Sequence, residues 1–276
     1  MALSSYERKA QDEIERYFRS PEEGLLGRVS RTLFKPVEVV AERLVPDSVL
    51  EAAGNAVEAA LKGIHQLSGM TLDVDAVLRE ARKHAEVVDS IEHLRRQDLR
   101  LCDKVAEEVA SQHGVVAALE GAGCGLGGLA LLAADVPLLF GVAMRVVRQL
   151  GVAYGVDPTT PGESVLALKI FELASGGTRD RYAELLQLEA LRDELDGLEP
   201  QKRAEKAAVL ATMFMSREAV KRIVSVLLSR KLLQTVPVAG AVVGAGFNYL
   251  FVADIAETAR QVYRRRLLLE KAKLEV

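Results

Sequence analysis

Apolar residues in this chain recur at intervals of three and four, which is the spacing of a helix face, rather than at every second position. The positions between them are filled largely by Ala, Leu, Glu and Arg, which favour helices. Residues 4–18 are one example, and their apolar side is formed by Tyr6, Ile14, Tyr17 and Phe18. The pattern predicts an all-α protein built as a multi-helix bundle.

Local signals mark where several helices begin and end. The spacing Thr160-x-x-Glu163 is that of a capping box, with Pro161 at the first helical position, and it predicts a helix start. Residues 73–112 are periodic and rich in charge, which predicts helices with a polar face in water and an end at Gly114.

Two further boundaries organise the chain. A break is expected near Val88–Ser90, and residues 178–197 and 201–215 predict a polar helical hairpin that extends from the main body. We predict a single helical domain over residues 1–276 in four parts. These are N-terminal helices over 1–72, a first glycine-rich unit over 73–177, the hairpin over 178–215 and a second glycine-rich unit over 216–276.

Two glycine-rich apolar segments distinguish the sequence. Residues 121–144 carry only the charge of Asp135, and residues 232–253 carry none. Each is long enough to cross about 30 Å of hydrocarbon. Because Asp135-Val136-Pro137 interrupts the first segment and Asp135 could cap a new helix, that segment is expected to form a helical hairpin instead.

The glycines of both segments are spaced for close helix packing. Small residues four apart lie on one helix face and let two backbones approach. Two interpretations follow: the tightly packed core of a soluble helical domain, or insertion into or against lipid. The glycines concerned are Gly121, Gly123, Gly125, Gly127, Gly240 and Gly244.

Basic residues border the second segment on both sides, with Arg230 and Lys231 before it and residues 264–266, all arginine, after it. A spanning helix would carry its excess of cations on one side, so this distribution favours a surface-docked or re-entrant helix, or no insertion at all. A clean membrane span is therefore not expected.

Polar residues within or beside the apolar segments are the candidates for a site. They are Asp135, Arg145, Asn248, Asp254 and Arg264. Each aspartate precedes an arginine by ten positions, which suggests a weak internal repeat. A buried carboxylate is costly unless it is paired, so the aspartates should meet arginines or helix N-termini. The set predicts either a buried polar lock between the glycine-rich units or a catalytic or proton-handling group.

Charge and cysteine content limit the classes of partner and compartment. The formal net charge of -3 provides no strongly basic character, so we expect no nucleic-acid partner. Two cysteines in 276 residues cannot form the disulfide framework of a secreted domain. The first 20 residues are charged and lack the apolar core of a secretory signal. We therefore expect a cytoplasmic protein.

Motifs for cofactors and metals are weak. Residues 123–128 have the glycine spacing of a dinucleotide site, but a helix precedes them and Arg148 stands where an acidic residue is needed. The four histidines include no pair at the i, i+4 spacing of a helical zinc site. Asp89 and His93 share a helix face and are interpreted as a surface ion pair. We expect neither a cofactor nor a metal.

Two groups of residues carry a resemblance to a known family. The first is Gly121 to Gly128, Asp135-Val136-Pro137, Arg145, Tyr154-Gly155-Val156-Asp157 and Glu163. The second is Pro237-Val238-Ala239-Gly240-Ala241-Val242-Val243-Gly244, Phe247-Asn248-Tyr249, Asp254, Ala259, Tyr263 and Arg266-Leu267. Together they resemble the bacterial EcsC family. The resemblance implies a helical protein, named for a gene beside those of an ABC transporter, with no established enzymatic activity.

Three functions remain open at this point. The leading hypothesis is a non-enzymatic protein, peripheral at the inner face of the cell membrane, that binds lipid or a membrane protein such as an ABC transporter. The second is a soluble carrier that encloses a hydrophobic ligand. The third is an enzyme acting on a membrane component, with Asp135 or Asp254 as its titrating group.

Overall fold

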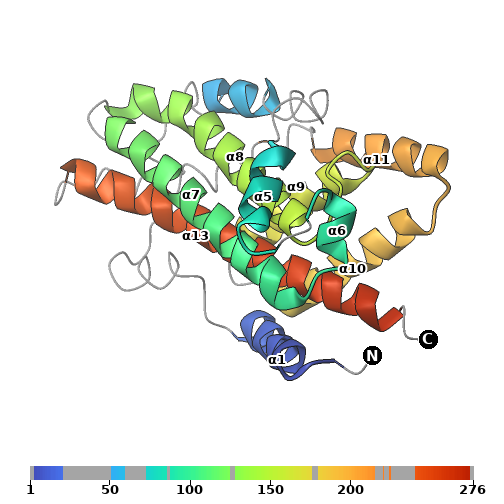
Figure 1. Ribbon diagram of the computed structural model, residues 1–276. Coiled ribbons are helices and arrows are strands. Elements are labelled where there is room, and N and C mark those ends of the chain that lie inside the picture. The colour runs from blue at the N-terminus through green and yellow to red at the C-terminus, as the bar shows by residue number, and fades with distance from the viewer. Residues whose placement is uncertain are drawn as a thin grey trace.

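Helices make up all the regular secondary structure that the computed structural model describes, so the all-α prediction is confirmed (Figure 1). The described residues are 3–20, 51–59, 73–85, 88–124, 128–175, 180–214, 220, 224 and 240–273; of these, 115–124, 128–135 and 240–247 are described by their backbone alone.

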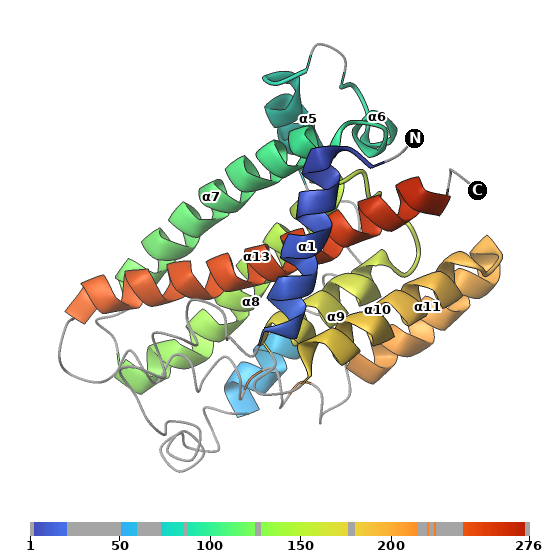
Figure 2. The same ribbon diagram turned by 90° about the horizontal axis from the view of Figure 1, so that it is seen from below.

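Three long helices form the centre of the molecule: α7 (Leu99–Cys124), α8 (Gly128–Ala153) and α13 (Gly240–Lys273). They pack against one another, and α7 runs in the opposite direction to the other two (Figures 1 and 2). Helix α9 (Glu163–Ser175) packs on both α8 and α13. Phe140 of α8, Phe171 of α9 and Phe251 of α13 form a chain of edge-to-face ring contacts at 5.2 and 6.4 Å, which links these helices through the core.

Shorter helices surround this centre. Helix α1 crosses α13 on one side, as Figure 2 shows, while α5 packs on α7 and α8, and α6 packs on α8. The hairpin of α10 and α11 packs on α9. Their bounds are Ser5–Arg19 for α1, Val74–Arg82 for α5, Ile91–Arg95 for α6, Arg181–Asp196 for α10 and Pro200–Phe214 for α11; residues 51–59 are also helical.

Several predicted boundaries are confirmed. The helix predicted over residues 4–18 is α1. It begins with a capping box that was not predicted from the sequence, in which the Glu7 N–H donates to Ser4 Oγ (3.2 Å) and the Ser4 N–H donates to Glu7 Oε2 (2.9 Å). The break near Val88–Ser90 lies between α5 and α6. The polar hairpin forms with Asp180 as the N-cap of α10, and Gly197 ends that helix.

Gly114 does not end α7, which continues to Cys124 and so corrects the prediction of a helix stop. The reason is tertiary packing, because a Cβ at Gly114 would lie 2.7 Å from Cε2 of Tyr249 on α13. Gly151 of α8 occupies a similar position, with a Cβ at 3.1 Å from the Tyr263 ring. These glycines let α7 and α8 approach aromatic side chains of α13 closely.

The predicted break at Asp135-Val136-Pro137 is also wrong, since α8 runs through Pro137 without interruption. An interior proline removes one helical hydrogen bond and costs roughly 3 kcal/mol in a free helix. Here Val136, Leu139 and Phe140 around it are buried, and their packing offsets that cost. Helices α7 and α8 do pack as an antiparallel pair, as the predicted helical hairpin would. However, α7 ends at Cys124, before the break predicted at residues 135–137.

The capping box at Thr160 is not formed, because α9 begins three residues later, at Glu163. Thr160 lies in a turn in which its carbonyl accepts from the Glu163 N–H at 3.1 Å. Gly162 has a φ of +99°, a left-handed conformation that glycine tolerates. The Glu163 carboxylate, which a capping box would direct back to the helix start, reaches across to α13 instead.

Candidate functional site

Three consecutive arginines of α13 each face a carboxylate on a different part of the fold. Arg264 pairs with α1 and α7, Arg265 pairs with Glu189 of α10, and Arg266 pairs with Glu163 of α9. Successive helix residues point about 100° apart, so three in a row reach different neighbours. Arg264 and Arg266 are buried, at 2% and 8% exposure, so their side chains face the interior of the fold.

Arg264 lies at the centre of the most enclosed charge network. Its Nε is 3.0 Å from Asp103 Oδ1 of α7, and its Nη1 and Nη2 donate to Glu13 Oε2 of α1 at 3.1 and 3.2 Å. Nη1 also donates to Gln261 Oε1 at 3.3 Å. The Nε–H is not directed at a described acceptor, so its contact with Asp103 is an ion pair rather than a hydrogen bond. One guanidinium thus connects three helices.

Asp103 is held by two tyrosines as well as by Arg264. The Tyr6 hydroxyl donates to Oδ2 and the Tyr154 hydroxyl to Oδ1, both at 2.6 Å. Burial, the hydrogen bond to Asp103 and the charge of Asp103 raise the pKa of Tyr6 to about 12. Burial and then the Asp103 charge raise the pKa of Tyr154 well above its ordinary value. Both phenols therefore stay protonated donors at neutral pH, and the carboxylate is fully satisfied.

A second buried pair fixes the other side of α13. Arg266 Nη1 donates to both Glu163 oxygens at 2.9 and 3.1 Å, and its Nε donates to Glu270 Oε1 at 2.9 Å. Burial raises the pKa of Glu163 above its ordinary value, although the Arg266 charge opposes that shift. The pair ties the start of α9 to the C-terminal half of α13.

The polar candidates from the sequence occupy different environments. Asn248 and Asp254 are buried on α13, at 1% and 9% exposure, while Arg145 is exposed on α8. The side chain of Asp135 lies outside the described part of α8. Ten residues of helix rise about 15 Å, so Arg264 cannot pair with Asp254 on its own helix. Arg264 thus enters a buried network, and its partners are residues that the sequence did not single out.

The glycines proposed for close packing are only partly described. Gly121 and Gly123 lie in α7, Gly240 and Gly244 lie in α13, and residues 125 and 127 fall outside the described ranges.

The polar face of residues 73–112 was expected to lie in water, but part of it is buried. Asp103 is buried at 7% exposure because it faces Arg264 rather than solvent. The predicted ion pair of Asp89 with His93 also takes another form. The Asp89 carboxylate lies 3.7 Å from Arg82, and its backbone N–H donates to His93 Nδ1 at 3.3 Å.

The charged groups of the network pair with one another and hold helices together. Every strong charge in it faces an opposite charge, and its carboxylates accept from guanidinium or phenol groups. The nearby thiol of Cys102 is buried, and burial raises its pKa to about 12, so it carries no nucleophilic thiolate at neutral pH. The arrangement favours a structural lock over acid–base chemistry.

One helical stretch among the described residues is long and apolar enough to cross a membrane, at Val136–Ala153. Of this window, 78% is buried within the protein, as expected of a core helix. In this structure, residues 136–153 of α8 therefore pack mainly in the core of the protein.

These features define a class of all-helical bundle in which glycine-rich helices meet and the closing helix is clamped by buried arginines. The chain belongs to the EcsC protein family, whose model matches residues 8–268. The resemblance seen in the sequence is thereby confirmed.

Two curated relatives from Bacillus subtilis (strain 168) match this chain. The first is described as an uncharacterized protein, YdbA, and is 31% identical over 188 residues, which cover 68% of this chain and 66% of the relative. The second, Protein EcsC, is 31% identical over 170 residues, which cover 62% of this chain and 65% of the relative. The alignments thus span just under two thirds of each relative's length. No solved structure matches the chain.

Proposed function

We propose that the protein is a peripheral membrane protein of the inner face of the cell membrane that contacts lipid through one end of its central helices. This apolar end comprises residues 121–124 of α7, 128–138 of α8 and 240–249 of α13. Its only charged residue is Asp135. The gathering of these three stretches at one end of the bundle carries the proposal (Figures 1 and 2).

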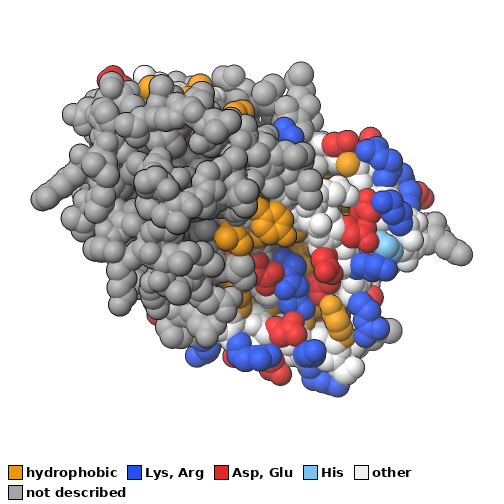
Figure 3. All heavy atoms as spheres, turned by 90° about the vertical axis from the view of Figure 1, so that its left-hand side faces the viewer, with side chains coloured by type: hydrophobic (Ala, Val, Ile, Leu, Met, Phe, Trp, Pro, Cys, Tyr) orange, Lys and Arg blue, Asp and Glu red, His pale blue; other side chains and the backbone are white. Residues whose placement is uncertain are grey.

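Exposed apolar side chains at the inner edge of the apolar end support this proposal. Leu138 is 53% exposed and Tyr249 is 43% exposed, and both lie about 15 Å along their helices from the ends that meet there. Figure 3 faces this end and shows hydrophobic side chains beside a surface of mixed charge. Large exposed apolar groups next to cations are typical of proteins that rest in a lipid interface.

The solvent face of α8 also places an exposed apolar side chain near a cation. Leu138, Gly141 and Arg145 lie at spacings of three and four, so they share one side of the helix. A Cβ at Gly141 would meet nothing within 4 Å, and Arg145 is exposed. Arg145 lies about 10 Å beyond Leu138 along the axis, which suits a guanidinium at the level of lipid phosphates when the leucine enters the acyl region.

Vesicle flotation tests the proposal. Tag-free protein should float with vesicles that contain anionic phospholipid, and Leu138→Glu should weaken that binding by about tenfold or more, because burying a leucine contributes about 1.5 to 3 kcal/mol. Arg145→Glu should weaken binding to anionic vesicles but not to neutral ones.

Met213→Glu is the matched control. Met213 is 63% exposed on α11, which packs on α9 and α10 and contributes nothing to the apolar end, so this change should leave flotation intact. Protein that stays unbound at low salt, or equal losses in Leu138→Glu and Met213→Glu, would contradict membrane contact through the apolar end.

A further inference from the structure

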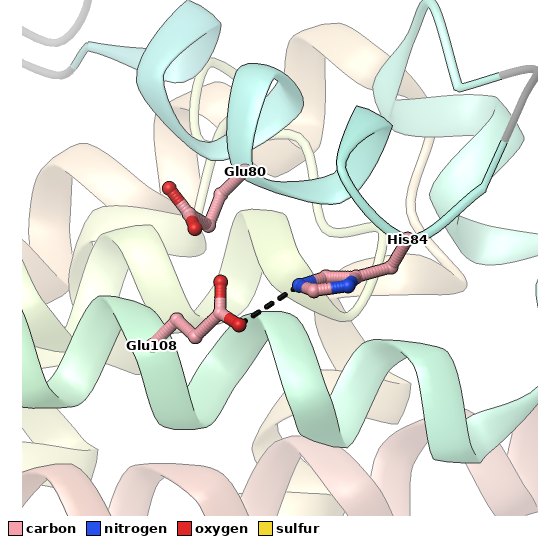
Figure 4. A group of neighbouring side chains, drawn as sticks. All are labelled: Glu80, His84 and Glu108. Carbon is pink, nitrogen blue, oxygen red and sulfur yellow. Dashed lines mark hydrogen bonds and ion pairs between the residues drawn. The ribbon is translucent and has the colours of Figure 1, made fainter.

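A group of potential metal ligands lies apart from both the arginine network and the apolar end. Glu80 is in the last turn of α5, His84 follows the C-cap of that helix, and Glu108 is on α7 (Figure 4). One ligand atom from each residue lies within 4.8 Å of the others. Glu108 lies 24 or more residues beyond the other two in the chain, so the group brings together two separate helices.

Core packing fixes the positions of these side chains. Helix α5 packs against α7, and Val77 and Ala81, which flank Glu80, are fully or almost fully buried. On α7, Val105 and Val109 flank Glu108 in the same way. The backbone atoms that carry the three side chains are therefore held by apolar contacts that do not depend on the polar group itself.

The polar contacts within the group leave one oxygen unsatisfied. His84 Nε2 lies 2.8 Å from Glu108 Oε1, as the dashed line in Figure 4 shows. Glu108 Oε2 is buried and has no hydrogen-bond donor among the described residues, although the side chain as a whole is 33% exposed. Figure 4 shows this oxygen directed toward Glu80. A buried carboxylate oxygen without a donor is costly, and a cation between the carboxylates would satisfy it.

We propose that Glu80, His84 and Glu108 bind a divalent transition-metal ion of the zinc type. One imidazole nitrogen and two carboxylate oxygens are three ligands that such an ion accepts, with a fourth position left for water. Ligand atoms about 2.0 to 2.1 Å from zinc lie roughly 3.3 Å apart in a tetrahedron. His84 and Glu108 are already closer than this, so rotation of the carboxylates is the main adjustment required.

Lys83 and Gln112 are the competing partners of the site. Lys83 Nζ donates to both Glu80 oxygens at 2.7 and 2.8 Å, and Gln112 Nε2 donates to Glu80 Oε2 at 3.4 Å. The Lys83 side chain is 61% exposed, so it can move into solvent when a metal takes its place. The surrounding charges, two carboxylates against one ammonium, favour a cation.

Zinc titration of metal-stripped, tag-free protein against a chromophoric chelator tests the site. Wild-type protein should bind one Zn²⁺ per chain, and His84→Ala and Glu108→Gln should each weaken binding by about tenfold or more. Glu108→Gln preserves side-chain shape, and circular dichroism verifies that both variants are folded.

Two further variants separate a metal site from an ion-pair cluster. Lys83→Gln removes the competing ammonium and should tighten Zn²⁺ binding by about two- to fivefold, the strength of an exposed ion pair. His93→Ala, a histidine outside the group, should bind Zn²⁺ as the wild type does. Absence of stoichiometric Zn²⁺ binding in the wild type, retention of binding in Glu108→Gln, or weaker binding in Lys83→Gln would overturn the proposal.

Discussion

Residues 240–253 of α13 carry no charge, whereas residues 254–273 of the same helix carry charged side chains on most of its turns. In the charged half, Arg264, Arg265 and Arg266 hold four neighbouring helices through carboxylates. In the uncharged half, Tyr249 is 43% exposed and the helix meets α7 and α8 at the apolar end. One helix therefore combines a buried, ion-paired half with an uncharged half that belongs to the surface proposed to contact lipid.

The largest effect is expected at the anchor. Arg264→Met leaves Asp103 buried without its cation and should lower the free energy of unfolding by about 3 to 5 kcal/mol, measured by urea denaturation at neutral pH. Arg96→Met is the control, because Arg96 pairs with Glu92 at the surface and its side chain is 75% exposed. That change should stay within about 0.5 kcal/mol of the wild type. Equal stability of the two variants would contradict an anchor at Arg264.

A smaller difference is expected between the two glycines that face tyrosines of α13. Gly151→Ala places a Cβ against Tyr263, which is 3% exposed and so has no room to move away. Overpacking should therefore outweigh the gain in helix propensity and lower the free energy of unfolding by about 1 kcal/mol. Gly114→Ala meets Tyr249, which is 43% exposed and can rotate outward. It should remain within about 0.5 kcal/mol of the wild type in the same denaturation experiment. A greater loss at Gly114 would show that the uncharged half is the more tightly packed.

The third effect concerns pH. The pKa of Tyr6 is about 12 in the fold and near its ordinary value of 10 in the unfolded chain. Above pH 10 the unfolded chain therefore loses this proton before the folded protein does, so the stabilisation present below pH 10 is lost as pH rises toward 12. Tyr6→Phe should make the decline of unfolding free energy over this interval less steep. Identical slopes in the variant and wild type would argue against the Tyr6–Asp103 contact.

The helical fold could be predicted from sequence because its signals are local. The apolar spacing in α1, the break before α6 and the hairpin of α10 and α11 are all encoded within a few residues of one another. The same reliance on local signals gave three wrong predictions: a helix end at Gly114, a break at Pro137 and a capping box at Thr160. At each of these positions a tertiary contact or the packing of neighbours outweighs the local preference.

The site was harder to predict because its partners are distant in the chain. Arg264 was singled out from its place beside the apolar segment, but Glu13 is 251 positions away. No spacing rule connects residues so far apart. Asp103 lies in a stretch whose charged side chains were predicted to face water. It meets Arg264 only because α7 and α13 cross. The group of Glu80, His84 and Glu108 contains no pair of histidines at helical spacing: Glu80 and His84 are four apart, and Glu108 comes from another helix.

The central claim is that the apolar end, and not the rest of the exposed apolar surface, contacts lipid. Because the chain has no tryptophan, a single one introduced by Leu138→Trp or by Met213→Trp reports its surroundings without background. With anionic vesicles that contain brominated lipid, the emission of Leu138→Trp should shift to shorter wavelength and be quenched, while that of Met213→Trp should not change. An unchanged spectrum for Leu138→Trp, or quenching confined to Met213→Trp, would contradict the claim.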